Sequence, residues 1–406
     1  MARAFLFLGF LLLPFSCFAG GFQINVQGQK QLGMGHTGTG LLLDGSFVFF
    51  NPGAGIFLDR RFTVNVGLNL LKPRVVYLEP APGIYKAEMV HNTGTPLEVY
   101  ASWRFGRWAA SLGVYTPFGS RAQWEDDWKG QFMIREINLK TIFIQPTVTF
   151  RVNDHIGIGA GFIYATGGFQ LRKGVPTQNQ LGEYGEGSLD GSASGTGYNL
   201  GVYFRFNDVW SAGFSYRSSV TVDVTNGTAN FTVPSSLAEY FPSTTFTTSI
   251  RLPQVMNAGI GYSTGRWKVA ADFNYVGWNS YDTLRIDFAD NTDKLKDIAS
   301  PREYKDSWIA RVGVQCQVNG RFALRAGCYF DKSPVSDGYL TPETPDADRI
   351  GITAGSTITL GKNLSLDLSF LFVEGMKRTD TNIETQFSGT YKSRLVAPGF
   401  GLTYQF

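Results

Sequence analysis

The sequence is poor in the residues that metal centres, disulfide frameworks and hydrolytic sites use. Its 406 residues include only three cysteines and three histidines, and their spacing matches neither a disulfide framework nor a Cys/His metal site. A lipase needs a Ser-His pair with an orienting partner. His36, His91 and His155 fall in three separate regions of the chain, so a shared site is not expected. The sequence predicts no enzyme, no metal site and no cofactor.

The few cysteines and charges also exclude other classes. Cys316 and Cys328 fall on two expected strands joined by a short turn, several rows apart in antiparallel pairing, so we expect free thiols that face lipid. Net charge is +3 and charged residues make up 17% of the chain. Both signs are mixed along the sequence, which gives no footprint for nucleic acid.

Long apolar runs are missing except at the amino terminus. Arg3 is followed by the apolar run Ala4–Phe15 and then by small residues at Cys17 and Ala19, the pattern of a secretory signal peptide. We therefore expect residues 1–19 to be a signal peptide. Acylation of Cys17 is the alternative, although the residues before it make a poor lipobox. Without a second long apolar run, no helical membrane protein is expected.

What the sequence has in abundance is glycine, aromatic residues and alternation. Glycine occurs 48 times and aromatics make up 15%. Apolar residues alternate with small or polar ones in many segments, each about the 9–11 residues of a tilted membrane strand; examples are 62–70, 156–164, 267–275 and 364–370. A soluble sandwich would show shorter strands.

The connections point to a barrel. Six short turns are expected at 105–107, 152–154, 206–208, 263–265, 318–320 and 360–362, alternating with longer polar stretches near 80–96, 118–130, 175–192, 227–245, 288–304, 336–348 and 376–388. This pattern predicts an all-β fold, a 14-stranded antiparallel transmembrane β-barrel over residues 60–406, in the outer membrane of a Gram-negative bacterium. Aromatics near strand ends fit interfacial girdles: Trp103, Trp108, Tyr115, Trp210, Trp278, Tyr281 and Trp308.

The two ends of the barrel domain carry further information. The last strand, with apolar residues at every second position from Phe400 to Phe406, is expected to pair with strand one near Arg61 to Leu70. Its terminal aromatic residue is expected to address the barrel assembly machinery. Residues 20–59 precede strand one and are rich in both glycine and apolar residues. They are either a disordered tail or a plug inside the lumen, and their apolar content favours the plug.

A series of short segments recurs in a characteristic order and spacing along almost the whole chain after residue 19. They are Gly21-Phe22-Gln23-Ile24, Leu32-Gly33, Thr37-Gly38, Asp44, Phe49-Phe50-Asn51-Pro52, Pro117-Phe118-Gly119, Trp124 to Gly130, Pro253, Trp267 to Trp278, Lys305 to Gly313, Arg325 to Val335, Pro342, Pro345-Asp346 and Asp348-Arg349. Together these segments resemble the FadL-type outer-membrane transporters of long-chain fatty acids and related hydrophobic compounds. One departure is Gly53, where the family has alanine after Asn-Pro; glycine loosens the backbone there.

The resemblance implies a barrel plugged by an amino-terminal hatch, with a lateral opening at an inward kink of the third strand beside the Asn-Pro-Ala element. The matching gating residues are Asn51, Pro52 and Gly53 in the hatch, and Pro117, Phe118 and Gly119 after the strand from Trp108 to Tyr115. Proline lacks the ladder donor and glycine tolerates a bend, which favours a kink independently. The alternative is that Pro117 and Gly119 simply begin an outer loop.

The resemblance also implies substrate contacts. Phe22 and Ile24 are expected to touch the tail of a ligand, and the outer-loop residues Leu237, Tyr240 and Phe241 to capture it, unless these three form a small packing cluster. A carboxylate head needs a basic partner. The matching positions are Arg172 and Lys173 near the outer end of strand five, and Arg302 or Lys305 before strand ten. Each could instead be a solvated surface charge.

The expected function is uptake of long-chain fatty acids or similar hydrophobic compounds, by capture at the outer loops, hatch movement and lateral exit. A channel for aromatic hydrocarbons is the alternative. A general diffusion porin is a further rival, but it requires an open lumen, which a plug would block. Expected partners are hydrophobic small molecules and outer-membrane lipids, with no nucleic acid, and the family precedent is a monomer.

Overall fold

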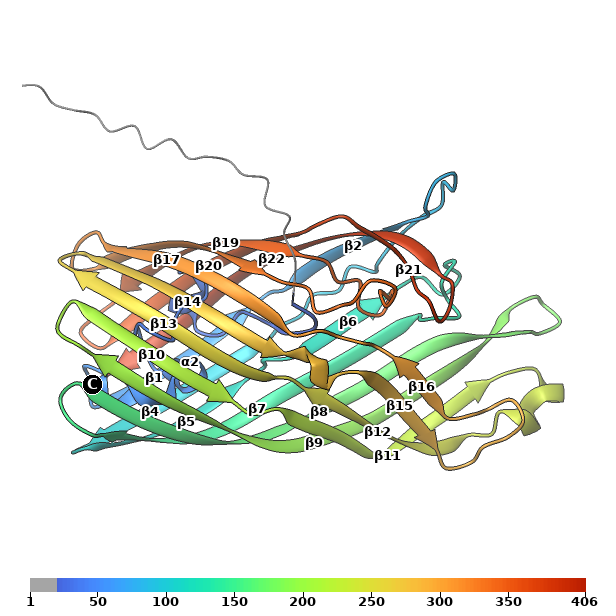
Figure 1. Ribbon diagram of the computed structural model, residues 1–406, viewed down its shortest axis with the longest axis horizontal. Helices are drawn as coiled ribbons and strands as arrows, with labels where there is room; N and C mark the ends of the chain where they lie inside the picture. The colour runs from blue at the N-terminus through green and yellow to red at the C-terminus, as the bar shows by residue number, and fades with distance from the viewer. Residues whose placement is uncertain (1–19) are drawn as a thin grey trace, which may run out of the picture.

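The chain forms one closed antiparallel β-barrel, described for residues 20–406 by a computed structural model (Figure 1). The expected signal peptide lies outside these residues. Several of the fourteen barrel strands are interrupted, so they comprise 22 segments: β1 (Phe62–Asn69) with β2 (Lys72–Leu78); β3 (Lys86–Glu88) with β4 (Leu97–Phe105); β5 (Trp108–Tyr115) with β6 (Gly119–Gln123); β7 (Glu136–Arg151); β8 (Ile156–Gln178); β9 (Tyr184–Arg205); β10 (Trp210–Arg217) with β11 (Val220–Thr232); β12 (Thr244–Leu252) with β13 (Gln254–Thr264); β14 (Trp267–Gly277) with β15 (Thr283–Phe288); β16 (Ile298–Pro301) with β17 (Ser307–Gln317); β18 (Phe322–Asp331); β19 (Arg349–Thr359); β20 (Leu364–Gly375) with β21 (Arg378–Thr381); and β22 (Ser388–Gln405).

The last strand closes the barrel against the first, as the sequence predicted. Strand β22 pairs with β1 in the register Thr63 to Gln405. Beyond that pair, the backbone N–H of Phe62 donates to Phe406 O at 2.9 Å, and the N–H of Phe406 donates back to Phe62 O at 3.0 Å. Closure removes edge strands, so every strand has neighbours on both sides.

The six predicted short turns are confirmed, and they lie together with the carboxyl terminus at one end of the barrel (Figure 1). One predicted loop is wrong. Strands β8 and β9 continue through most of 175–192 and are joined only by residues 179–183. The outward positions of this extension are polar, as at Glu186 and Asp190. A strand beyond the bilayer needs no apolar outer face, so the alternation signal fades there although the pairing continues.

The outer face carries the aromatic girdle, with three exceptions to the prediction. Trp103, Trp108, Trp210 and Trp308 are exposed on the outer wall, and both cysteines are unpaired, four residues apart in register. Three other predicted girdle residues are instead buried inside the barrel: Tyr115, Trp278 and Tyr281. Tyr115 has the inward parity of β5. The other two lie in the break between β14 and β15, which contains the short 3₁₀ helix η3 (Trp278–Ser280) and turns into the lumen.

Residues Gly20–Leu58 lie within the ring of strands (Figure 1) and are almost entirely buried. They form the helical turns α1 (Gln29–Leu32), α2 (Phe47–Phe50) and η1 (Pro52–Phe57); a further 3₁₀ helix, η2 (Ser235–Tyr240), lies in an outer loop. We call Gly20–Leu58 the N-terminal segment. No helix among the described residues is long and apolar enough to cross a membrane.

Polar side chains of the wall satisfy the irregular backbone of the N-terminal segment. Asp272 Oδ2 accepts the N–H groups of Gly38 and Thr39 at 2.7 and 2.8 Å. On another side of the barrel, Glu98 accepts the N–H of Gly28 at 2.7 Å. Irregular backbone at membrane depth is tolerated only where protein or water satisfies it, and here inward-facing side chains do so.

Candidate functional site: a cavity behind a break in the wall

The third barrel strand is interrupted at the residues that the sequence singled out. Strand β5 pairs with β7 as far as Tyr115 opposite Phe143, and β6 resumes with Gly119 opposite Lys140. Three residues, Thr116 to Phe118, therefore face only two residues of β7. This is a one-residue β-bulge. Thr141 Oγ1 donates to Phe118 O at 2.7 Å and holds the bulged residue in place.

The N-terminal segment pairs with this bulge. Gln23 and Phe118 form an isolated antiparallel bridge. The N–H of Ile24 donates to Pro117 O at 2.9 Å, and the N–H of Gly119 donates to Phe22 O at 3.0 Å. At this level the third barrel strand does not pair with the second strand, and its backbone forms hydrogen bonds with the N-terminal segment instead.

The ladder between the second and third barrel strands is therefore interrupted. Their ladder ends at Val99 opposite Val114. The next contact toward the outer end is the N–H of Val90 donating to Gln123 O at 2.8 Å. Between these two points, residues 91–98 pair instead with the first strand, for example through the bridge Leu71 to Gly94. We call this break, bounded by residues 91–98 and 115–122, the lateral window.

A cavity of about 740 Å³ lies behind the lateral window and reaches through it. Its inner lining includes Phe22 and Ile24 of the N-terminal segment, together with buried wall residues such as Leu371. Its outer lining includes Leu97, which is exposed on the outer wall, and Gly119. One continuous space therefore joins the interior of the barrel to its membrane-facing surface.

Phe22, which lines this cavity, is held in place by a cluster of aromatic rings behind it. The ring of Phe22 packs edge-on against Trp278 at 4.7 Å and Tyr281 at 5.5 Å, and Phe118 lies 6.3 Å from it. The N–H of Gly21 donates to Asp346 Oδ2 at 2.9 Å, which fixes the start of the segment, and burial raises the pKa of Asp346. Phe22 and Ile24, whose backbones pair with the bulge, thus also line the cavity.

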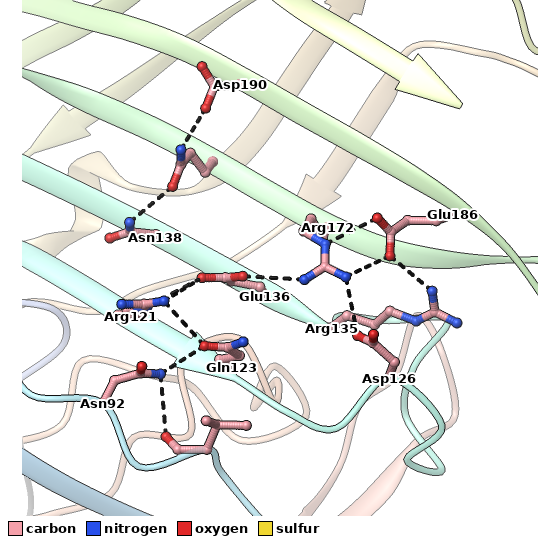
Figure 2. Close-up of polar contacts among 12 residues, drawn as sticks. Asn92, Arg121, Gln123, Asp126, Arg135, Glu136, Asn138, Arg172, Glu186 and Asp190 are labelled. Atoms are coloured by element: carbon pink, nitrogen blue, oxygen red, sulfur yellow. Dashed lines mark hydrogen bonds and ion pairs between the residues drawn. The ribbon is translucent and has the colours of Figure 1, made fainter. Parts of the chain in front are cut away.

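Arg172 lies outside this cavity, in a network of charges on the outer wall. Its guanidinium contacts Glu186 at 2.8 Å, Asp126 at 3.2 Å and Glu136 at 3.5 Å (Figure 2). Glu136 also pairs with Arg121 at 3.1 Å, and the network runs on through Gln123, which ties the third strand to the second above the lateral window. Three carboxylates already surround Arg172, and its neighbour Lys173 does not line the cavity either.

The other two basic positions predicted for a head group are also not in the cavity lining. Arg302 is buried and pairs with Glu343 at 2.5 Å; Glu343 itself lines the cavity. Lys305 is exposed. A lysine that the sequence reasoning missed, Lys140, does line it. Within residues 20–406 the ammonium of Lys140 has no hydrogen bond or ion pair, and it lies directly opposite Gly119. The alternating pattern of β7 does not distinguish Lys140 from the other outward-facing residues of that strand.

The outer-loop residues contact neighbouring parts of the outer wall and loops rather than the cavity. Leu237, Tyr240 and Phe241 lie in or next to η2 and are half-buried. Phe241 lies 5.8 Å from the ring of Phe231, and Tyr240 O accepts a hydrogen bond from Thr292. None of the three lines the cavity.

The Asn-Pro-Gly element is not beside the bulge, contrary to the expectation from the resemblance. Asn51 is fully buried and donates through Nδ2 to Val202 O on β9 and to Thr39 O, both at 3.0 Å. Its Oδ1 accepts the N–H of Gly53 at 3.0 Å. Pro52 O accepts from Thr149 Oγ1. The element is therefore seated against β7, β8 and β9 near the short-turn end, whereas Phe22 to Ile24 contact the bulge.

Comparisons with known proteins agree with this architecture. The model of a family described as outer membrane protein transport protein (OMPP1/FadL/TodX) matches residues 11–406. The long-chain fatty acid transport protein of Escherichia coli K12 is 22% identical, with 97% of this chain and 96% of that protein covered.

Solved structures show the same fold. A Pseudomonas aeruginosa FadL homologue superposes with a TM-score of 0.82 at 17% identity, covering 95% of this chain and all of that one. The Pseudomonas putida toluene transporter TodX gives 0.72 at 15% identity, covering 96% and 99%. The family match extends over nearly the whole chain and takes in the cavity, the bulge and the N-terminal segment. The chain belongs to the OMPP1/FadL/TodX family of outer-membrane transport proteins.

Proposed function

We propose that the protein takes up long-chain fatty acids or similar amphipathic hydrophobic compounds, and releases them sideways through the lateral window. The observation that carries the proposal is the single cavity that touches both Phe22 inside the barrel and Leu97 on its outer wall. Its volume of about 740 Å³ lies within the range of about 300–1,000 Å³ that is typical of ligand pockets. The name of the Escherichia coli relative supports fatty acids as the substrate class.

Sideways release follows from the physical chemistry of such a ligand. A hydrocarbon tail gains free energy on leaving water for an apolar environment. A route through the lateral window keeps the tail next to Leu97, Val114 and Ile142, all of which line the cavity, and then next to lipid. An aqueous path to the short-turn end would lead through the N-terminal segment instead.

Entry and release require the stretch Phe22 to Ile24 to move. This stretch lies against the bulge through the isolated bridge at Gln23 and two backbone hydrogen bonds. A ligand tail that displaces Phe22 from Trp278 would break the contact nearest to those bonds. The N-terminal segment then acts as a hatch, and Asn51, Pro52 and Gly53 act as its fixed seat rather than as part of the window.

Lys140 is the best placed partner for a carboxylate head. It lies on the outer face opposite Gly119, with an ammonium that no carboxylate of the described chain neutralises. The previously expected Arg172 already has three acidic partners. A fatty acid leaving through the window would pass its head group to Lys140 while the tail enters the membrane.

Substitution of Gly119 tests the route. A Cβ atom at Gly119 would lie 3.0 Å from Ile24 Cδ1 and 3.1 Å from Leu139 O, so a leucine side chain must fill the window. We expect Gly119→Leu to slow oleate uptake by about tenfold or more, which corresponds to about 1.4 kcal/mol on the barrier. Uptake of labelled oleate by cells that depend on this protein is the measurement.

Gly168 provides a matched control. Gly168 of β8 pairs with Lys140 of β7, which in turn pairs with Gly119 of β6. The nearest atom to an added Cβ at Gly168 is Gly191 O at 3.8 Å. Gly168→Leu should leave uptake unchanged. Heat-modifiable migration on gels should show that both variants assemble. Normal oleate uptake by an assembled Gly119→Leu barrel would refute lateral release.

Uptake of aromatic hydrocarbons is the second candidate. The ring of Phe22 in the cavity lining, which packs against Trp278 and Tyr281, favours it, as does the fold shared with the toluene transporter TodX. Binding of oleate and of toluene to wild type and Lys140→Gln separates the two. Loss of a charged hydrogen bond costs about 1.5–3 kcal/mol, so oleate binding alone should weaken about tenfold or more if a carboxylate is the natural head group.

A further inference from the structure

A second, much smaller cavity lies between the N-terminal segment and the wall. Its volume is about 20 Å³, which is enough for one water-sized occupant. Gln23, Asn25 and His36 line it from the N-terminal segment, and Arg217 of β10 and Arg311 of β17 line it from the wall. Two guanidinium groups from different strands therefore share one enclosed space.

Both arginines are buried and lack a carboxylate partner. Arg217 is 3% exposed and Arg311 5%, and neither has an ion pair with a described residue. Arg217 donates to Phe49 O at 2.7 Å and lies over the ring of Phe49 at 4.3 Å, but its Nε has no acceptor in the protein. A buried charge without a counter-charge is strongly unfavourable.

Arg311 shows the same pattern. Its Nε donates to Asn274 Oδ1 at 2.6 Å and its Nη2 donates to Asn25 Oδ1 at 2.9 Å, while its Nη1 lacks a protein acceptor. Two buried carboxylates, Asp272 and Asp331, act on Arg311 electrostatically without forming an ion pair with it, and each has closer partners. Asp272 accepts two backbone N–H groups of the N-terminal segment, and Asp331 pairs with Arg349 at 3.0 Å.

His36 adds a third donor. Its Nε2 accepts the N–H of Gln27 at 3.1 Å. Burial, reinforced by the positive charge of Arg311, lowers the pKa of His36 well below its usual value, so the ring is neutral. A neutral imidazole that accepts at Nε2 carries its proton on Nδ1. The ring also packs edge-on against Phe50 at 4.9 Å, which fixes its orientation.

We propose that Arg217, Arg311 and His36 bind one small inorganic anion of the size of chloride in this cavity. A water molecule could accept only two hydrogen bonds and would add no negative charge beside Arg217, which forms no ion pair with a described residue. A halide accepts from all three donors and compensates the charge. The terminal amide of Gln23, whose Oε1 also lacks a partner, can rotate to present its NH₂ group.

The anion would link the N-terminal segment to the wall. Gln23 and Asn25 line this small cavity on one side and the 740 Å³ cavity on the other, so the site lies directly behind the strand that pairs with the bulge. Occupancy by the anion should hold this strand in its seat. The inference concerns a site separate from the lateral window and is independent of which hydrocarbon is transported.

Crystals of the whole purified protein grown with sodium bromide test the site. We expect an anomalous bromide peak among the side chains of Arg217, Arg311 and His36, at the same position in crystals grown over a range of bromide concentrations. A well-ordered water there with no anomalous signal, in a crystal that shows bromide elsewhere, would overturn the proposal.

Thermal unfolding in detergent provides the second measurement. The change of unfolding temperature from sulfate to chloride or bromide at equal ionic strength contains a general salt effect, because sulfate stabilises proteins by exclusion from their surface. Binding at the site should add a halide-specific rise that saturates with concentration. Arg217→Gln and Arg311→Gln should lose this rise, whereas Arg251→Gln, at an exposed position of β12, should keep it. If one arginine variant fails to fold, the other variant and the wild-type bromide crystals still test the anion site. An equal change from sulfate to halide in wild type and in both arginine variants would contradict the proposal.

Discussion

At the scale of residues, the seat of the N-terminal segment depends on backbones that touch without side chains between them. Gly53 shows this most clearly. An added Cβ atom there would lie 2.7 Å from Gly157 O, 2.8 Å from Gly201 O and 2.9 Å from Tyr203 N. Glycine at this position was expected to loosen the backbone relative to the alanine of the family. Its role here is instead to allow close approach to β8 and β9.

Gly53→Ala should therefore lower stability although alanine is the residue expected from the family. The contacts are backbone atoms that cannot move aside like a side chain, and overpacking of this kind costs about 1–3 kcal/mol. The measurement is urea unfolding of the refolded protein in detergent micelles. Gly361→Ala, in a turn where nothing lies within 4 Å of an added Cβ, should have no comparable effect. Equal unfolding midpoints for Gly53→Ala and wild type would contradict the role of Gly53 as a contact point.

The site was only partly predictable residue by residue. Phe22, Ile24 and Gly119 could be found because they belong to short recognisable matches, and the structure places all three at the cavity. Arg172 and Lys140 show the limit. Whether a basic side chain is free depends on carboxylates far away in the chain, such as Glu186 beside Arg172, and a single sequence contains no record of that pairing.

At the scale of elements, the third strand carries the main irregularity of the wall. Its bulge has one residue more than the facing part of β7, and Pro117 contributes no N–H to either neighbour. The sequence predicted this break because proline and glycine are rare inside central strands. It did not predict the partner of the break, the strand Phe22 to Ile24, since that contact joins segments about a hundred positions apart.

Deletion of Pro117 should close the wall. With one residue removed, Thr116 and Phe118 would face Ile142 and Thr141, and β6 would keep its present register with β7 from Gly119 opposite Lys140 onward. We expect a barrel that assembles normally but transports oleate at least about tenfold more slowly, a change of about 1.4 kcal/mol. The comparison is uptake by a variant that lacks Lys296, in the exposed loop before β16. Full uptake without the bulge would mean that the ligand leaves by another path.

The long hairpin of β8 and β9 shows where pattern reading fails at this scale. Inside the bilayer, lipid enforces apolar outward residues such as Phe162 and Leu200, and the strands are easily recognised. Farther out the outward positions are polar: Arg172 pairs with Glu186, and Asp190 accepts a hydrogen bond from Gln170 (Figure 2). The pairing of β8 with β9 is continuous, but its surroundings change from lipid to water. Because water does not require apolar outward residues, the polar part of the hairpin was predicted as a loop.

At the scale of the whole molecule, the barrel is a polar-lined ring around a polypeptide that fills it. Inward side chains such as Asp272, Glu98 and Thr353 accept hydrogen bonds from backbone N–H groups of the N-terminal segment. A barrel with this lining does not need the segment in order to close, because β22 pairs directly with β1. The count of fourteen strands and this closure followed from the sequence, since turn spacing and the final aromatic strand are local signals.

Removal of the N-terminal segment should therefore turn the protein into an open pore. A chain that begins at Asp59 and is refolded from inclusion bodies keeps every strand, and water can satisfy the polar lining that the segment now covers. In liposome swelling, we expect rapid entry of small sugars through this shortened barrel and little entry through the full barrel. The full protein should still bind oleate, whereas the shortened one should lose binding that depends on Phe22 and Ile24. Equally fast sugar entry through both forms would favour the general diffusion porin, because it would show that the segment does not block the lumen.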